Sequence, residues 1–409
     1  MEELVSAEIR TEGDAAYFEM SDPSFSVLSE QVRSGREQNW YAQTNYGIAA
    51  LRYEEVRSLL RDRRMRQGLS TWPLENGVPA DSPVVDFWAS GFVAKSGEAH
   101  ARLRRLANPI FAPATIESLK PGFRSLTNEL IDRIAARGRC EFIGDFCEEF
   151  SARILLQLLG VENHEIWRDL QRMAGDFALS LGVQVAAELP RVEAALAELY
   201  EFADNLVDAT RRNAQETAIA SLVAAHDNGE LSEKELRIFI VDLIFGGLDT
   251  TKNQLGIALS VFLEHPDQWD LLAERPELAP RATEEVLRIR PTVLWITRHV
   301  TEDMVIGGLE VPEGTTVHLM TQPANTDPRV GADGPFDISA ENPQHLTFGA
   351  GPHHCVGHLL ARTDIGAALP VLAQRLRNLR ADGPAIFRPW SGVGGPIELP
   401  IAFDAAPAA

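Results

Sequence analysis

The sequence predicts a mainly α-helical fold with a smaller β region, organised as one domain over residues 1–409. Most of the chain shows the helical spacing of apolar residues among Ala, Leu, Glu and Arg, whereas strand-like segments occur in only three places. No repeat, low-complexity block or long linker divides the chain. A single helical fold with a strand-rich region is therefore expected, although the length alone would allow two or three domains of about 150 residues.

Amphipathic segments define the predicted helices, and segments rich in β-branched and turn residues define the predicted strands. Helices are expected over 98–110, 116–136, 145–159, 191–212 and 232–263. The last of them opens at Ser232 with Glu235 three residues later, which is the pattern of a capping box. Strands are expected near 40–51, 293–320 and 385–403, with turns at Gly307-Gly308 and Glu313-Gly314.

The charge and cysteine content exclude several classes of function. With 38 basic and 59 acidic residues the formal net charge is −21 at pH 7, so we expect neither a nucleic-acid partner nor a membrane-surface partner. No apolar run is long enough to span a membrane, and residues 1–14 lack a signal-peptide pattern. The three cysteines have no zinc-type spacing and are typical of a reducing compartment. A soluble, cytoplasmic protein is expected.

The most informative segment is a glycine-rich loop around Cys355, directly before a predicted helix. A cysteine at a helix N-terminus lies near the positive end of the helix dipole, which favours the thiolate. Glycines on both sides leave room for a flat, bulky group to approach the backbone. A lone cysteine is more often a buried structural residue, so the flanking residues must decide between that role and a thiolate metal ligand.

This loop resembles the heme-ligand signature of the cytochrome P-450 family, F-G-x-G-x-H-x-C-x-G. All six fixed positions match, through Phe348, Gly349, Gly351, His353, Cys355 and Gly357. The resemblance implies heme b (iron protoporphyrin IX) as cofactor, with Cys355 as the axial iron ligand, Phe348 packed near the sulfur and His353 against a propionate. It also implies the family fold, with the heme between the long central helix and the helix that follows the cysteine loop.

A second motif lies midway along the long predicted helix. Gly246-Gly247 in a helix interior costs about 1 kcal/mol per glycine relative to Ala, and Asp249 and Thr250 add further non-helical preference. Two explanations are open for these residues in a helix. Either a group must come close to the helix backbone, or the glycines pack against another helix. The resemblance favours the first interpretation, because the family has [A/G]-G-x-[D/E]-T here. It implies that Asp249 and Thr250 relay protons to iron-bound dioxygen.

Further positions gain a role only through the resemblance. His100 and Arg104 match the H-x-x-x-R of a helix that crosses one heme edge, and Arg298 occupies the usual place of another propionate ligand. Glu285 and Arg288 match Glu-x-x-Arg, which alone would be an ordinary surface pair but in the family is a structural lock beneath the heme.

The third member of that lock is often an arginine, and this chain has Ala340 there. Either another base such as Arg329 completes the network, or the lock has two members. The substrate pocket is expected to be apolar, which fits a hydrophobic small molecule without selecting a class. By alignment with the family it should include Phe87, Trp88, Phe177, Val241, Phe245, Val293, Leu294, Trp295 and Val393.

The function implied by the resemblance is that of a soluble bacterial-type heme-thiolate monooxygenase, which activates dioxygen and most simply hydroxylates its substrate. Epoxidation, dealkylation or ring coupling would use the same residues. No flavin or iron–sulfur motif occurs, so electrons are expected from a ferredoxin and a ferredoxin reductase. The predicted docking site is a basic patch of Arg102, Arg104, Arg105 and Arg362.

Three alternatives stay open from the sequence. A peroxide-driven or isomerase-type heme-thiolate enzyme is disfavoured by the acid–alcohol pair Asp249-Thr250. A non-catalytic heme-based sensor or carrier would not need that pair, and a helical scaffold would have no cofactor at all.

Overall fold

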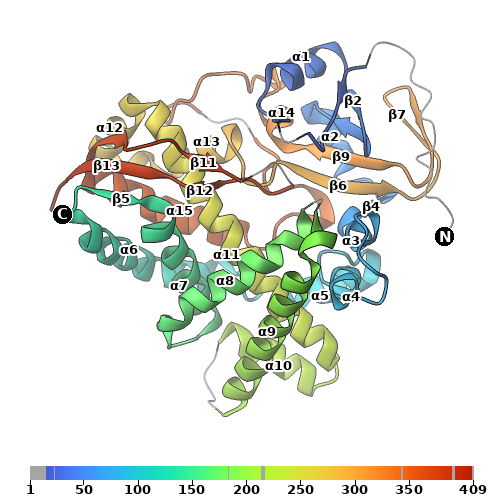
Figure 1. The fold of residues 1–409 in the computed structure, drawn as a ribbon, viewed down its shortest axis with the longest axis horizontal. Coiled ribbons are helices and arrows are strands. Elements are labelled where there is room, and N and C mark those ends of the chain that lie inside the picture. Colours follow the sequence, from blue (N-terminus) through green and yellow to red (C-terminus); the bar gives the residue numbers. More distant parts are fainter. Residues whose placement is uncertain are drawn as a thin grey trace.

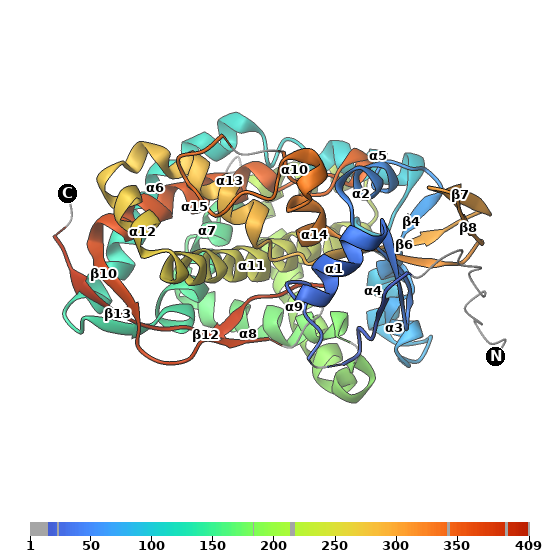
Figure 2. The ribbon, with the colours of Figure 1, turned by 90° about the horizontal axis from the view of Figure 1, so that it is seen from above.

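The computed structural model describes residues 15–407 except 23, 183, 213–216, 342–343 and 389–391, so the predicted absence of a signal at residues 1–14 lies outside it. Figures 1 and 2 show a larger helical part and a smaller β-rich part side by side, with the long helix α11 (Glu233–Glu264) crossing the middle of the molecule in both views. The predicted mainly α fold with a smaller β region is confirmed.

The five predicted helices form; their ends differ from the prediction by at most three residues, except that the helix predicted over 191–212 begins at Val185. They are α5 (Gly97–Ala107), α6 (Pro113–Ala135), α7 (Glu148–Leu159), α9 (Val185–Arg212) and α11. The start predicted for the third helix is wrong, because a π-helical turn, Ile143–Cys147, precedes α7. The other helices are α1 (Glu30–Gln38), α2 (Tyr53–Leu59), α3 (Trp72–Glu75), α4 (Pro83–Ser90), α8 (Trp167–Ala178), α10 (Ala218–Asp227), α12 (Pro266–Glu274), α13 (Ala279–Ile289), α14 (Thr321–Asn325) and α15 (His358–Arg375).

Helix α11 is buried along most of its length, which explains why apolar residues occur on all its sides. Its predicted capping box is confirmed, since the Ser232 hydroxyl accepts the Glu235 N–H and the Glu235 carboxylate accepts the Ser232 N–H. The two central glycines have different surroundings. A Cβ on Gly247 would lie 3.0 Å from Leu155 of α7, whereas nothing lies within 4 Å of a Cβ built on Gly246. Gly247 therefore serves helix packing, and Gly246 leaves open space.

The main sheet has six strands in the order β1-β2-β3-β9-β6-β4. Strand β9 is parallel to β3, pairing Val317 with Ile48, and antiparallel to β6, pairing His318 with Thr297. The strands are β1 (Tyr17–Phe18), β2 (Tyr41–Thr44), β3 (Gly47–Ala50), β4 (Met65–Gln67), β6 (Trp295–Val300) and β9 (Thr316–Met320).

Three smaller sheets complete the strands. Sheet β10-β13-β5 consists of β10 (Leu376–Ala381), β13 (Pro400–Ala405) and β5 (Arg139–Glu141). The pairs are β7 (Met304–Ile306) with β8 (Leu309–Val311), and β11 (Ile386–Phe387) with β12 (Pro396–Glu398). The three predicted strand regions are confirmed, while β1, β4, β5 and β10 lie outside them.

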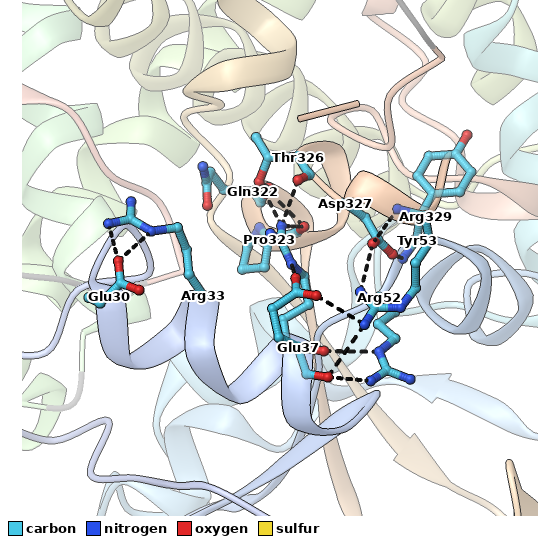
Figure 3. A network of polar contacts seen from close by, with 11 residues as sticks. Glu30, Arg33, Glu37, Arg52, Tyr53, Gln322, Pro323, Thr326, Asp327 and Arg329 are labelled. Carbon is cyan, nitrogen blue, oxygen red and sulfur yellow. Dashed lines mark hydrogen bonds and ion pairs between the residues drawn. The ribbon is translucent and has the colours of Figure 1, made fainter. Parts of the chain in front are cut away.

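A polar network ties α1 to α14 (Figure 3). The Arg36 guanidinium donates two 2.7 Å hydrogen bonds to main-chain carbonyls in and just after α14. Arg329 pairs with Asp327 at 3.2 Å and with Glu37 of α1 at 3.1 Å. These contacts join α1 to α14 and to the residues that directly follow α14, which precede the cysteine loop in the sequence.

Among the described residues, none of the helices combines the length and the apolarity needed to cross a bilayer.

Candidate active site

A cavity of about 430 Å³ lies between α11 and the cysteine loop. From α11 it is lined by a stripe at helical spacing, Asp242, Gly246 and Thr250, and on the other side by Phe348 and Cys355. Strands β6 and β9 and the segment from α3 to α5 close its remaining sides. The cavity thus occupies the place predicted for the heme, between the long central helix and the helix after the cysteine loop.

The cysteine loop presents a thiol to this cavity. Cys355 is exposed there, and its main-chain N–H donates to the Phe348 carbonyl at 2.9 Å. Burial in the protein interior raises the pKa of the Cys355 thiol, and the Gly357 N–H, Arg104 and Arg362 act in the opposite direction. These donors and charges are what a thiolate ligand needs.

Two glycines give the loop its path. Gly349 has φ +70° and Gly351 has φ +72°, values that favour glycine. At Gly351 a Cβ would also lie 3.0 Å from the Leu60 carbonyl oxygen. Beside them, the Arg362 guanidinium lies 4.4 Å from the centre of the Phe348 ring and covers one face of it.

Four nitrogen-bearing side chains converge on the same cavity from three parts of the chain: His100 and Arg104 from α5, Arg298 from β6 and His353 from the cysteine loop. The His100 and His353 ring centres are 4.1 Å apart. Arg298 is only 2% exposed, and burial lowers its pKa to about 10. Burial, followed by the nearby His100 and the two arginines, lowers the pKa of His353 to about 3.

This cluster contains no anion. No carboxylate in the described part of the chain pairs with any of the four side chains, and His100 Nε2 is buried without a partner. Arg298 donates to the side chain of Gln67 and to the Thr297 carbonyl, which are both neutral acceptors. Buried cations normally have an anionic partner, so the donor set fits the two carboxylates of a heme placed over Cys355.

Thr250 and Asp249 are adjacent in sequence but point to different surroundings. The Thr250 hydroxyl donates to the Gly246 carbonyl at 2.6 Å and lines the cavity. The Asp249 carboxylate is turned away, where Lys252 lies at 3.1 Å and Arg388 at 3.1 Å. Burial alone would raise the pKa of Asp249, but Lys252 and Arg388 outweigh it and hold that pKa below its usual range. Neither cation was singled out from the sequence.

Glu285 and Arg288 form a buried ion pair at 2.6 Å. Arg288 also donates to the main-chain carbonyl of Ala332, and the Asp337 N–H donates to Glu285 at 3.4 Å. The sequence left open whether Arg329 is the third member of this lock or whether the lock has only two members. Arg329 instead pairs with Asp327 and with Glu37 of α1. The charged part of the lock has two members, and main-chain groups complete it.

Five of the nine predicted pocket residues line the cavity: Trp88, Phe245, Val293, Trp295 and Val393. The prediction is wrong for the other four, Phe87, Phe177, Val241 and Leu294, which lie behind the wall.

The physical reasons are local. Phe177 stacks on the far side of Trp88 with ring centres 5.7 Å apart, and Phe87 packs against Phe177 at 4.9 Å. Leu294 is 4% exposed and belongs instead to the buried apolar cluster that includes Phe18 and Met320. Val241 is rotated by about 100° around α11 from Asp242, which does line the cavity.

The expected basic patch is also corrected. Arg104 points into the cavity and donates to the His354 carbonyl at 2.6 Å. Arg102 pairs with Glu235, and Arg362 pairs with Glu284 at 2.6 Å. Of the four arginines only Arg105 is exposed, because the other three are partly buried and bind groups within the protein.

Comparison with known proteins decides the family. Residues 268–386 match the model of the Cytochrome P450 family. The chain is 34% identical over 397 residues to Luteothin monooxygenase of Streptomyces thioluteus, which covers 96% of this chain and 97% of that protein. The chain belongs to the cytochrome P450 family. The resemblance found in the cysteine loop is thereby confirmed.

Other relatives agree. The P450 is 32% identical over 360 residues to Mycinamicin IV hydroxylase/epoxidase of Micromonospora griseorubida, covering 86% of this chain and 88% of that protein. Its fold matches the crystal structure of CalO2 with a TM-score of 0.84 and 29% identity, over 93% of this chain and 98% of that one. The protein is an oxidoreductase, a heme-thiolate cytochrome P450 monooxygenase.

Proposed function

We propose that this P450 inserts one oxygen atom of dioxygen into an apolar small organic molecule by hydroxylation, with heme b held by Cys355. The supporting observation is that Cys355 of the cysteine loop and Thr250 of α11 line one cavity whose remaining wall is largely aromatic and aliphatic. The helical and the β-rich parts both contribute residues to the wall of this cavity, which supports a single heme domain.

The roles of the surrounding residues follow from their positions. His100, Arg104, Arg298 and His353 bind the heme carboxylates, because they form a buried cluster of donors without an anion. Phe348, covered by Arg362, shields the thiolate side from water. When bound, the heme supplies the binding and activation of dioxygen. The protein supplies orientation, exclusion of water and protons.

Protons reach the cavity through Thr250 and Asp249. The Thr250 hydroxyl is a polar group on the cavity wall, and it donates to the Gly246 carbonyl one helical turn earlier. Asp249 is held ionised by Lys252 and Arg388. The Arg388 side chain is 26% exposed, so it connects this buried carboxylate to solvent.

Electrons come from a separate ferredoxin and ferredoxin reductase, since the sequence contains no flavin or iron–sulfur motif. Exposed Arg105 on α5, on the thiolate side of the cavity, is the part of the predicted basic patch that remains for docking. A cytoplasmic location fits three cysteines that are all unpaired.

The ligand assignment is tested by Cys355→Ser with Cys140→Ser as a matched control. Cys140 is a buried thiol outside the cavity wall. We expect Cys355→Ser to abolish the red-shifted Soret band of the reduced carbon monoxide complex, and Cys140→Ser to keep it. Survival of that band in Cys355→Ser would refute the assignment.

The reaction is tested by turnover. A panel of terpenoids, steroids, aromatics, fatty acids and polyketide-like compounds is titrated by the Soret shift, and binders are incubated with a ferredoxin pair. Hydroxylated product supports the proposal. Binding without any product would indicate a sensor, and peroxide-driven turnover that is insensitive to Thr250→Ala would indicate a peroxide user.

A further inference from the structure

One carboxyl group of the cavity has no part in the mechanism above. Asp242 lies on α11 eight residues before Thr250, and both side chains line the same cavity. At 1.5 Å rise per residue the two positions are about 12 Å apart along the helix axis. Phe92 and Phe239 lie beside Asp242, and the His100 ring stacks on Phe92 with ring centres 5.1 Å apart.

Only one of the two oxygens of the Asp242 carboxylate accepts a hydrogen bond from the described residues. Its Oδ2 accepts the main-chain N–H of Phe92 at 2.8 Å. Its Oδ1 makes no hydrogen bond within the described ranges and is not among the fully buried side-chain atoms that lack a partner. Asp242 itself is one of the residues that line the cavity. No lysine, arginine or histidine that the structure describes forms an ion pair with it. By contrast, the buried carboxylates Asp249 and Glu285 each have a cationic partner.

An unpaired carboxylate in such surroundings is costly. Burial raises the pKa of Asp242 to about 7, and the Phe92 N–H only partly offsets this. Transfer of a charged group out of water costs several kcal/mol unless a counter-charge is supplied. Since the described residues supply none, the carboxyl takes up a proton near neutral pH unless a cationic ligand supplies the counter-charge.

We propose that Asp242 determines substrate class by pairing with a protonated amine of an otherwise apolar substrate. This inference rests on the proposed function, because it places the substrate in the cavity over the heme.

A purely structural role for Asp242 makes a different prediction. The loop after α4 comes close to Asp242, since a Cβ on Gly91 would lie 3.2 Å from Oδ2. Holding this loop requires one acceptor oxygen for the Phe92 N–H, and an asparagine has one. Asp242→Asn therefore removes the charge while keeping the loop contact.

The test uses the heme-loaded protein and three probes of equal chain length: protonated N,N-dimethyldodecylamine, dodecan-1-ol and dodecanoate. Each is titrated at pH 7.5 by its Soret shift. The wild type should bind the amine more tightly than the other two, with the high-spin shift given by an alkyl end near the iron. Asp242→Asn should weaken amine binding by at least about 30-fold, as for loss of a buried charge partner, and change alcohol binding by less than about 3-fold.

Two further variants serve as controls. Asp86→Asn removes the same charge from an exposed pair with Lys234 and should leave all three affinities unchanged. Asp242→Leu should abolish the preference for the amine even if Asp242→Asn folds poorly. All variants are first checked for the red-shifted carbon monoxide band.

The proposal is overturned by a wild type that binds the alcohol as well as the amine, by equal weakening of both probes in Asp242→Asn, or by a red-shifted Soret band that places the amine on the iron. These outcomes differ from failure of the proposed function, in which the wild type would lack the carbon monoxide band or form no product from any bound compound.

Discussion

Removing the charge of Glu285 should destabilise the protein strongly. The side chains of Glu285 and Arg288 are 4% and 2% exposed, and two hydrogen bonds of 2.6 Å and 2.7 Å join them. In Glu285→Gln the Arg288 guanidinium stays buried and keeps only neutral acceptors. Breaking a buried ion pair from one side costs about 3–5 kcal/mol, because the remaining charge has no counter-charge.

The assay is urea unfolding followed by tryptophan fluorescence, with heme in the same excess for every variant because bound cofactor adds to apparent stability. The matched control is Glu264→Gln. Glu264 pairs with Arg290 through the same kind of bidentate contact, but its side chain is 54% exposed. We expect the control to lose less than about 1 kcal/mol.

Replacing both partners tests the reasoning further. The double variant Glu285→Leu, Arg288→Met should regain part of the stability lost by Glu285→Gln, since no charge is then buried alone. Recovery should be incomplete, because the carbonyls that Arg288 now satisfies would lose their donor. A loss in Glu285→Gln no larger than in the Glu264 control would refute the argument.

Three more variants test other parts of the site. Arg298→Gln should weaken heme binding by at least about 10-fold in a heme titration, yet leave the heme-free protein equally stable or more stable, because a buried unpaired cation is removed. Gly351→Ala should cost about 1–2 kcal/mol in urea unfolding, since its φ is +72° and its Cβ would lie 3.0 Å from a carbonyl oxygen; an unchanged midpoint would contradict this. Burial opposes ionisation of Glu284, but His345 and Arg362 lower its pKa to about 2, so its stabilising effect is present above pH 4.5 and lost as the pH falls toward 2. The stability difference between wild type and Glu284→Gln should therefore narrow only below pH 4.5 in thermal unfolding.

The parts of the fold that were predictable have long local patterns. The capping box at Ser232 and the apolar residues that follow it define α11 almost to the residue, because both signals are local. Strand β4 has only three residues, so it has no measurable alternation, and it forms because β6 offers it a partner from far along the chain. Helix α7 began later than expected since the π-helical turn before it also buries apolar residues.

The site residues that could be predicted are likewise those with a local sequence signal. Cys355 could be singled out because its ligand role depends on a short contiguous motif. The pairing of Asp249 with Arg388 joins residues 139 positions apart, which no local pattern reveals. Asp242 carried no signal either, since an acid in an amphipathic helix is ordinarily taken as solvent-facing. Phe87 and Trp88 were equivalent in sequence, and only the packing of Phe177 behind Trp88 separates them.

The network between α1 and α14 has a consequence for synthesis on the ribosome. The carbonyl that Arg36 binds in α14 lies 287 positions downstream, and β3 must wait equally for its neighbour β9. At about 5–20 residues per second, the edge of β3 that faces β9 stays unpaired for about 15–60 s, while its other edge can pair with β2. An unpaired strand edge is prone to aggregate during that interval. Because the cysteine loop leaves the ribosome later still, a chain that ends between β9 and this loop has every strand of the main sheet but lacks Cys355.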